Sequence, residues 1–148
     1  MAHTAETYRE AAGEMASLAR DLHSREQYAV AHYLAGLAVE CVLRAYRVRR
    51  DPQFDSRHDI IELVKEAKFY DFVPDESQAK VTEAVHTVAR RWSNDHRYRP
   101  ARMIELWLKE QGLDKWVSGD RLKFSSDKIV KASLLIVSIG EQQWNVRP

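Results

Sequence analysis

The sequence feature that most constrains the fold is a long apolar segment in the first third of the chain. Residues 29–43 read AVAHYLAGLAVECVL. A helix that is apolar nearly all round is usually central and buried, or shared between the core and a partner. Ser24 with Gln27 predicts a capping box at its start, and Pro52 predicts its end. We therefore expect a central helix over about 25–49.

Helical periodicity also marks most of the remaining chain. Apolar residues recur at steps of three and four, and Pro, Gly and Ser supply starts and stops. The other expected elements are a helix around 8–22, one over 58–69 started by Ser56 and Asp59, one from Pro74 to about Trp92, one over 101–111 ended by Gly112, a small β-hairpin near 116–124, and a last helix from Ser125 or Ser126 to about Trp144. The sequence thus predicts one all-α domain over 1–148, a bundle of five to six helices.

Composition narrows the class of protein. A length of 148 residues suits one domain with a real core. The single cysteine, Cys41, lies in an apolar run, which favours a packed thiol in a reducing cytoplasm. No segment is typical of a secretory signal or a membrane span. No metalloprotease, P-loop, dinucleotide-binding or reactive-serine motif occurs, so we expect neither a metal nor a cofactor.

The basic charge is concentrated in two arginine-rich segments. Residues 44–50 carry four arginines and no acid, and residues 90–102 carry five arginines and Asp95. The planar guanidinium suits bidentate phosphate contacts, whereas the alternative is a pair of solvated helix ends. The candidate phosphate-binding residues are Arg44, Arg47, Arg49, Arg50, Arg97, Arg99 and Arg102.

The stretch RRWSNDHRY, residues 90–98, holds the candidate site. The polar run Ser93–Asp95 competes for the backbone, which predicts that the helix ends after Trp92. In an unbroken helix Arg91 and His96 would lie about 140° apart, whereas a break lets them approach one another. An imidazole can move protons and a guanidinium stabilises charge on a phosphate, so the pair suits phosphodiester chemistry.

One histidine does not supply both proton transfers of RNA cleavage. A base is needed at the 2′-hydroxyl and an acid at the leaving oxygen. A two-fold dimer duplicates every residue across its axis, so it brings two copies of His96 to one cleft. The nuclease hypothesis therefore entails a homodimer.

Three features, in this order, resemble the HEPN domain family. The segment AHYLAGLAVECVLRAY resembles the apolar helix of the family, with Glu40 and Arg44 as its polar residues. His58-Asp59, followed by an apolar run, resembles its HD-hydrophobic helix start. RWSNDHRY resembles its R-x4-6-H signature and the R-x4-H-x-Y form of toxin members. The resemblance covers nearly the whole chain.

The resemblance implies a metal-independent endoribonuclease at a dimer cleft, with Arg91 and His96 as the site. Arg90 is the alternative arginine, because active members place a small polar residue where Trp92 stands. It also implies that a nucleotidyltransferase antitoxin can adenylylate Tyr98. The expected supporting residues are Tyr98, Asn94, Asp95 and Glu40. The alternatives are a non-catalytic HEPN module that binds nucleotide or a nucleotidyltransferase, and a structural helical dimer.

Each candidate residue also has a purely structural interpretation. Arg91 and His96 could be a helix-end cation and a loop histidine. Trp92 continues an apolar stripe and is expected in the core. Tyr98 could cap the bundle with its ring inward. Glu40 is expected to pair with Arg44 one turn on, the alternative being a contact with Arg90, Arg91 or His96. His32 and His86 are expected on ordinary helix faces.

Overall fold

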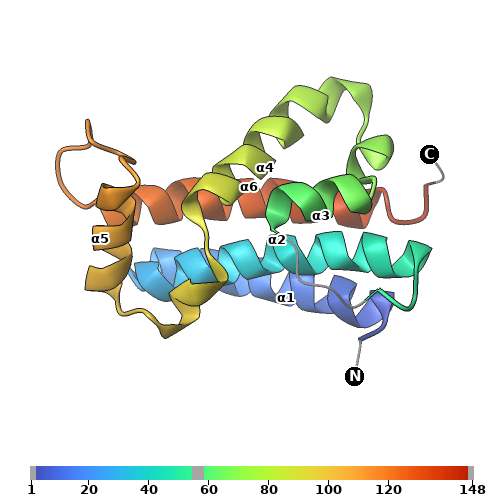
Figure 1. Ribbon diagram of the computed structural model, residues 1–148, viewed down its shortest axis with the longest axis horizontal. Coiled ribbons are helices and arrows are strands. Elements are labelled where there is room, and N and C mark those ends of the chain that lie inside the picture. Colours follow the sequence, from blue (N-terminus) through green and yellow to red (C-terminus); the bar gives the residue numbers. More distant parts are fainter. Residues whose placement is uncertain (1–2, 55–58, 147–148) are drawn as a thin grey trace.

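A computed structural model describes residues 3–54 and 59–146, and these residues form six α-helices and three short 3₁₀ helices without any strand. The predicted all-α bundle is confirmed (Figure 1). The elements are α1 (Ala5–Ser24), α2 (Tyr28–Arg50), α3 (Ile60–Glu66), η1 (Phe69–Phe72), η2 (Asp75–Ser77), α4 (Gln78–Arg91), η3 (Asn94–Tyr98), α5 (Ala101–Glu110) and α6 (Arg121–Gln142).

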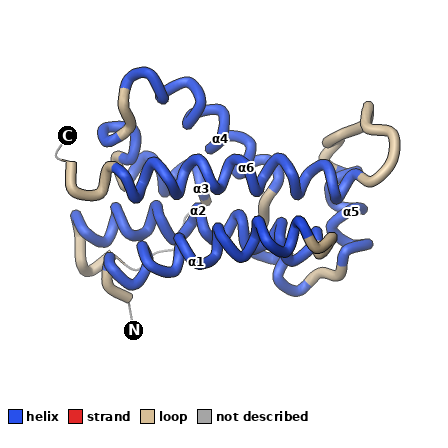
Figure 2. The backbone as a smooth tube through the Cα atoms, turned by 180° about the vertical axis from the view of Figure 1, so that it is seen from behind, coloured by secondary structure: helices blue, strands red, loops and turns tan. Residues whose placement is uncertain are grey.

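Helix α2 is the centre of the molecule, as its apolar sequence predicts. It packs along α1 and α6, and α3 and α4 cover the side of the bundle opposite α1 (Figures 1 and 2). Small side chains allow α1 and α2 to approach closely: the buried residues include Ala12, Ala16 and Ala19 on α1 and Ala31, Ala35, Ala38 and Ala45 on α2. No helix in the described part of the chain is long and apolar enough to cross a membrane.

The start of α2 differs from the prediction. Ser24 is the last residue of α1, and its hydroxyl donates to the Arg20 carbonyl at 3.2 Å. The chain then turns through Glu26, whose φ of 64° is left-handed, and α2 begins at Tyr28 without a side-chain cap. The predicted capping box is therefore wrong, because a tight turn between antiparallel helices occupies those residues. The predicted end before Pro52 is confirmed.

The predicted β-hairpin is also wrong. Residues 111–120 form a loop, and α6 already begins at Arg121, where the Asp120 carboxylate accepts the Lys123 N–H at 2.9 Å. Ser125 and Ser126 do not cap this helix, since both lie buried inside its second turn. Asp120 is an equally good N-cap, and starting the helix earlier buries Leu122.

The start of α3 agrees with the expectation in part. The Asp59 side chain caps the helix by accepting the Glu62 N–H at 2.8 Å. Ser56 and His58, which also belong to the predicted start and to the HD motif, lie outside the described residues.

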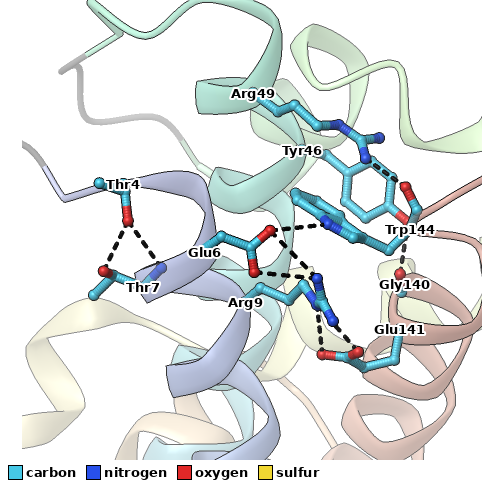
Figure 3. Close-up of polar contacts among 9 residues, drawn as sticks. All are labelled: Thr4, Glu6, Thr7, Arg9, Tyr46, Arg49, Gly140, Glu141 and Trp144. Carbon is cyan, nitrogen blue, oxygen red and sulfur yellow. Dashed lines mark hydrogen bonds and ion pairs between the residues drawn. The ribbon is translucent and has the colours of Figure 1, made fainter.

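One end of the bundle is closed around Trp144, as Figure 3 shows. The buried indole has the Arg49 guanidinium 3.9 Å from its ring centroid and the Arg9 guanidinium at 5.2 Å. Its N–H donates to Glu6 at 3.2 Å, and the Tyr46 hydroxyl donates to the Gly140 carbonyl at 2.6 Å. We call this set of residues the Trp144 end. It ties the first turns of α1 to the last turns of α2 and α6.

Cys41 lies within α2 and is 7% exposed. Burial raises the pKa of its thiol to about 12, and the neighbouring Glu40 carboxylate adds to the shift. The thiol is therefore protonated at neutral pH, which agrees with the predicted packing role.

Candidate functional site

The break between α4 and η3 creates the candidate site. Helix α4 ends at Arg91, and Trp92 and Ser93 adopt extended backbone conformations. The Ser93 hydroxyl accepts the Asp95 N–H at 3.3 Å, and His96 Nδ1 accepts the Ser93 N–H at 3.4 Å. The predicted break is confirmed, and the polar side chains that were expected to compete for the backbone form its hydrogen bonds.

His96 points into the protein. Its ring is 2% exposed and packs against Trp107 of α5 and His32 of α2, with centroid distances of 4.6 and 5.6 Å. Nε2 is buried without a hydrogen-bond partner. The pKa of His96 is lowered to about 4, mainly by burial and also by the positive charge of Arg99, while Asp95 opposes the shift. His96 is thus neutral at pH 7 and can accept a proton.

His32 is a member of the site that its helix position did not reveal. It is fully buried, with Nε2 2.8 Å from Ser125 Oγ and Nδ1 without a partner. Both histidines were expected on ordinary helix faces: His86 lies on an exposed face of α4, and His32 lies on the buried face of α2. Burial lowers the pKa of His32 to about 3, and His96 and Arg91 contribute in that order. His96 therefore lies against a second buried imidazole, on which the charge of Arg91 also acts.

Arg91 is held by a buried acid, Asp114. Nη1 and Nη2 donate to the two carboxylate oxygens at 2.7 and 2.9 Å, and the two side chains are 11% and 2% exposed. Asp114 has a left-handed φ of 61°, and its carbonyl accepts from Arg121 Nε at 3.3 Å. No motif marks Asp114 in the sequence. The only partial signal is its type, since Asp tolerates left-handed turns after a helix.

The second candidate arginine lies elsewhere. Arg90 is exposed on the last turn of α4, and its Nε donates to the His86 carbonyl at 3.3 Å. Arg91, by contrast, contributes to the lowered pKa of His32. Of the two candidate arginines, Arg91 is thus the one whose charge acts on a buried histidine.

Trp92 has the core role that its spacing indicates. Its indole N–H donates to the Tyr33 carbonyl at 3.0 Å, and its ring is stacked at 6.1 Å from that of Tyr33. The ring covers Gly36 so closely that a Cβ at this position would overlap it. A glycine in the middle of α2 is therefore required by the side chain that follows Arg91.

A pocket of about 530 Å³ lies beside the motif. Its lining includes Glu40, Asp59, Asp95 and the side of Trp92, together with Ser93 and Asn94. Glu40 accepts from Arg44 at 3.2 Å, which confirms the expected pairing within α2. Carboxylates from three elements face this pocket, so it does not favour a phosphate.

The two arginine segments do not form one surface. Arg49 packs on Trp144, Arg50 donates to the Glu66 carbonyl at 2.6 Å, and Arg47 lies 3.5 Å from Asp51. Arg49 lies about 20 Å along α2 from Gly36, where the motif packs. Arg97, Arg99 and Arg102 follow His96 along the chain, and the positive charge of Arg99 acts on the His96 ring.

Tyr98 lies at the surface. Its ring is 72% exposed, and the Arg97 guanidinium stacks over it at 4.4 Å. The interpretation in which this ring turns inward to cap the bundle is therefore wrong. An exposed phenol two residues from the buried His96 is open to a partner protein.

Within residues 3–54 and 59–146, no group of three or more His, Cys, Asp or Glu side chains is arranged to hold a metal ion. The polar groups at this end of the bundle are the paired imidazoles of His96 and His32, the Ser125 hydroxyl bound to His32, and the Arg91–Asp114 ion pair. Their chemistry is proton transfer and anion binding.

Comparison with known proteins agrees with the resemblance found in the sequence. The sequence model described as HEPN domain matches residues 5–115. The match includes the whole R-x4-H-x-Y stretch and ends just after Asp114. No match was found among curated proteins or solved structures.

Proposed function

Because the chain belongs to the HEPN domain family, we propose that it is a metal-independent endoribonuclease that acts as a homodimer, with Arg91 and His96 as its site. The observation that carries this proposal is the break after Arg91, which turns His96 inward against the buried imidazole of His32. A buried polar cluster is expensive for a small apolar bundle, so its presence favours a functional role.

The proposed reaction is attack of the RNA 2′-hydroxyl on the adjacent phosphorus. Neutral His96 accepts the hydroxyl proton, and the bond from phosphorus to the 5′-oxygen breaks. The Arg91 guanidinium stabilises the charge that develops on the non-bridging oxygens. The second copy of His96 donates the proton that the 5′-oxygen takes up, which requires that this imidazole be exposed to water, because its ordinary pKa is about 6.5 whereas burial keeps it neutral. Arg97, Arg99 and Arg102 hold the flanking phosphates.

The exposure of Tyr98 supports control by a partner. Its phenol is accessible and lies close to basic side chains. A nucleotidyltransferase antitoxin could transfer a nucleotide to this oxygen, and the added phosphate would attract the arginines that otherwise bind RNA. The proposed cellular role is therefore a toxin of a two-protein system.

A second candidate function is a non-catalytic HEPN module that binds nucleotide or a nucleotidyltransferase. The observation that favours it is that Arg91 and His96 are both largely inaccessible to a ligand in this structure. Both Nη groups of Arg91 are bound to Asp114, and His96 is 2% exposed. Binding through the exposed arginines and Tyr98 would need neither group.

One assay separates the two functions. Labelled single-stranded RNA is incubated in EDTA with the wild-type protein, His96→Gln, Arg91→Lys and two matched controls, His86→Gln and Arg90→Lys. The nuclease hypothesis expects cleavage by the wild type and both controls, and a loss of about 100-fold or more in the two site variants. Cleavage that persists in His96→Gln excludes the site, and no cleavage by any folded protein favours the binding module.

The dimer is tested by light scattering during size-exclusion chromatography. A mass of twice 17.2 kDa is expected. A monomer at the concentration where RNA is cleaved would remove the second proton carrier from the mechanism.

A further inference from the structure

Helix α5 and the 111–120 loop form a separate layer at one end of the bundle. Figure 1 shows α5 lying across the ends of the long helices, and Figure 2 shows the same arrangement from behind. This layer is joined to the bundle through a small hydrophobic cluster, Ile104 and Leu108 of α5 with Leu122 of α6, which is separate from the main core. Such a unit needs less free energy to detach than the α1–α2–α6 core does.

This layer encloses both groups of the proposed site. Trp107 of α5 packs edge-on against the His96 ring at 4.6 Å. Asp114 of the loop occupies both Nη groups of Arg91, with distances of 2.7 and 2.9 Å. These two contacts cover most of both groups, since Arg91 is 11% and His96 2% exposed, and a phosphate can take the bidentate position on Arg91 only by displacing Asp114.

We propose that α5 and the 111–120 loop are a lid over Arg91 and His96, and that the Arg91–Asp114 ion pair is a latch that an RNA phosphodiester displaces. The choice of RNA as the ligand rests on the proposed function. The opening of the lid can be tested without any cleavage of RNA.

The Arg91–Asp114 ion pair favours a ligand that carries a negative charge on two neighbouring oxygens. A carboxylate and a phosphodiester both present two oxygens to the same guanidinium fork, so they compete for Arg91. A neutral ligand gains nothing from displacing Asp114.

The chain has suitable pivots on both sides of the lid. Arg99 and Pro100 are extended between η3 and α5, and Gly119 has a left-handed φ of 109° before α6. Rotation at these points moves Trp107 and Asp114 together, and it leaves Ser125 and His32 in place on α6 and α2.

The first test measures how fast diethyl pyrocarbonate modifies each histidine at pH 7, read by mass spectrometry. Exposed His86 is the internal reference, and buried Cys41 reports global unfolding through a thiol reagent. Asp114→Asn should raise the rate at His96 about tenfold or more relative to His86, because a buried guanidinium loses its counter-charge. The matched control is Asp120→Asn, the same change in the same loop, where Asn keeps the helix cap. It should alter the rate less than twofold.

An unchanged rate at His96 in folded Asp114→Asn overturns the latch, and so does an equal rise in Asp120→Asn. A second measurement uses the wild type, so it holds even where Asp114→Asn does not fold. In increasing urea, His96 should become reactive at a lower concentration than Cys41 does. Simultaneous exposure of the two residues would show that no lid opens separately from the core.

The ligand is tested with 2′-O-methyl single-stranded RNA, which cannot be cleaved. Asp114→Asn should bind it about fivefold or more tightly than wild type and Asp120→Asn at equal salt, since no carboxylate competes for Arg91. Equal affinities would overturn displacement by a phosphodiester. If the lid responses and tighter binding occur but no variant cleaves natural RNA, the nuclease proposal fails and the lid stands.

Discussion

The two ends of the bundle contain similar aromatic and arginine side chains, but they differ in how their buried polar atoms are paired. At the Trp144 end, two arginines flank an indole, and Tyr46 and Trp144 each donate a hydrogen bond. At the opposite end, which we call the His96 end, Arg91 pairs with a buried acid, and His32 and His96 each bury a ring nitrogen without a partner.

The two ends differ in how completely their buried polar atoms are hydrogen-bonded. Unsatisfied buried polar atoms lower stability and are rare in folded proteins. The Trp144 end demonstrates that this sequence can close a bundle with satisfied polar groups. Two of the four buried side-chain atoms without a partner in the described residues are ring nitrogens of His32 and His96, which lie at this end with their ring centroids 5.6 Å apart. We take this pairing of buried imidazoles as consistent with a site that must open.

The largest effect should come from comparing the arginines of the two ends. Arg91→Ala leaves the Asp114 carboxylate buried and unpaired, so the free energy of unfolding should fall by about 3–5 kcal/mol. Arg49→Ala removes an exposed side chain that stacks on Trp144, and it should lower the free energy by about 1 kcal/mol. Urea unfolding of both variants measures the difference. Equal losses would contradict the contrast between the ends.

Acid should weaken the His96 end selectively. The pKa values of His96 and His32 are lowered to about 4 and about 3, so the unfolded chain binds protons first as the pH falls. Stability is full above the unfolded value of about 6.5 and is lost as the pH falls toward 4, by about 3 kcal/mol for His96 alone.

The measurement is urea unfolding of wild type and His96→Gln at pH 7, 6, 5 and 4. The variant should show a shallower fall over this range because it lacks one of the two buried histidines. A wild-type stability that does not change between pH 6.5 and 5 would show that the buried imidazoles do not control acid sensitivity.

The packing of Trp92 makes glycine necessary at one position of α2. Gly36→Ala places a methyl group into the Trp92 indole, so it should lower stability by about 1–3 kcal/mol despite the better helix propensity of alanine. Gly13→Ala is the control, because no atom lies within 4 Å of its Cβ, and it should raise stability by up to about 1 kcal/mol. Thermal unfolding of the two variants compares them, and opposite signs are expected.

The smallest effect should separate two tyrosine hydroxyls. Tyr46→Phe removes a buried hydrogen bond to the Gly140 carbonyl and should lower stability by about 1 kcal/mol. Tyr98→Phe changes a ring that is 72% exposed and should stay within about 0.5 kcal/mol. A loss in Tyr98→Phe equal to that of Tyr46→Phe in urea unfolding would place Tyr98 among the structural residues.

Features that depend on neighbouring residues were predictable from the sequence. The run of apolar residues over 29–43 predicted α2 as the central helix, and Ser93 to Asp95 predicted the break after Trp92 through their local competition for the backbone. The pairing of Glu40 with Arg44 was predictable for the same reason, since the two residues are one helical turn apart.

The contacts that close the site were not predictable in the same way. Asp114 meets Arg91 only after α5 reverses the chain, and Ser125 meets His32 across two helices. Both are tertiary contacts between residues that lie far apart in sequence, and serine near an apolar stripe resembles a helix cap as much as a buried donor. The hairpin prediction failed because Asp120 caps α6, so this helix begins at Arg121 and includes residues that were assigned to the second strand.

The burial of Cys41 makes site-specific labelling of this protein possible through an introduced cysteine. Cys41 is the single cysteine of the chain, and its thiol is buried and protonated at neutral pH. A fluorescent or spin label attached through a new cysteine at Trp116, which is 75% exposed in the 111–120 loop, would therefore react there without removal of the native thiol. Because Cys41 does not react with the label, the signal in single-molecule spectroscopy would come from the 111–120 loop alone.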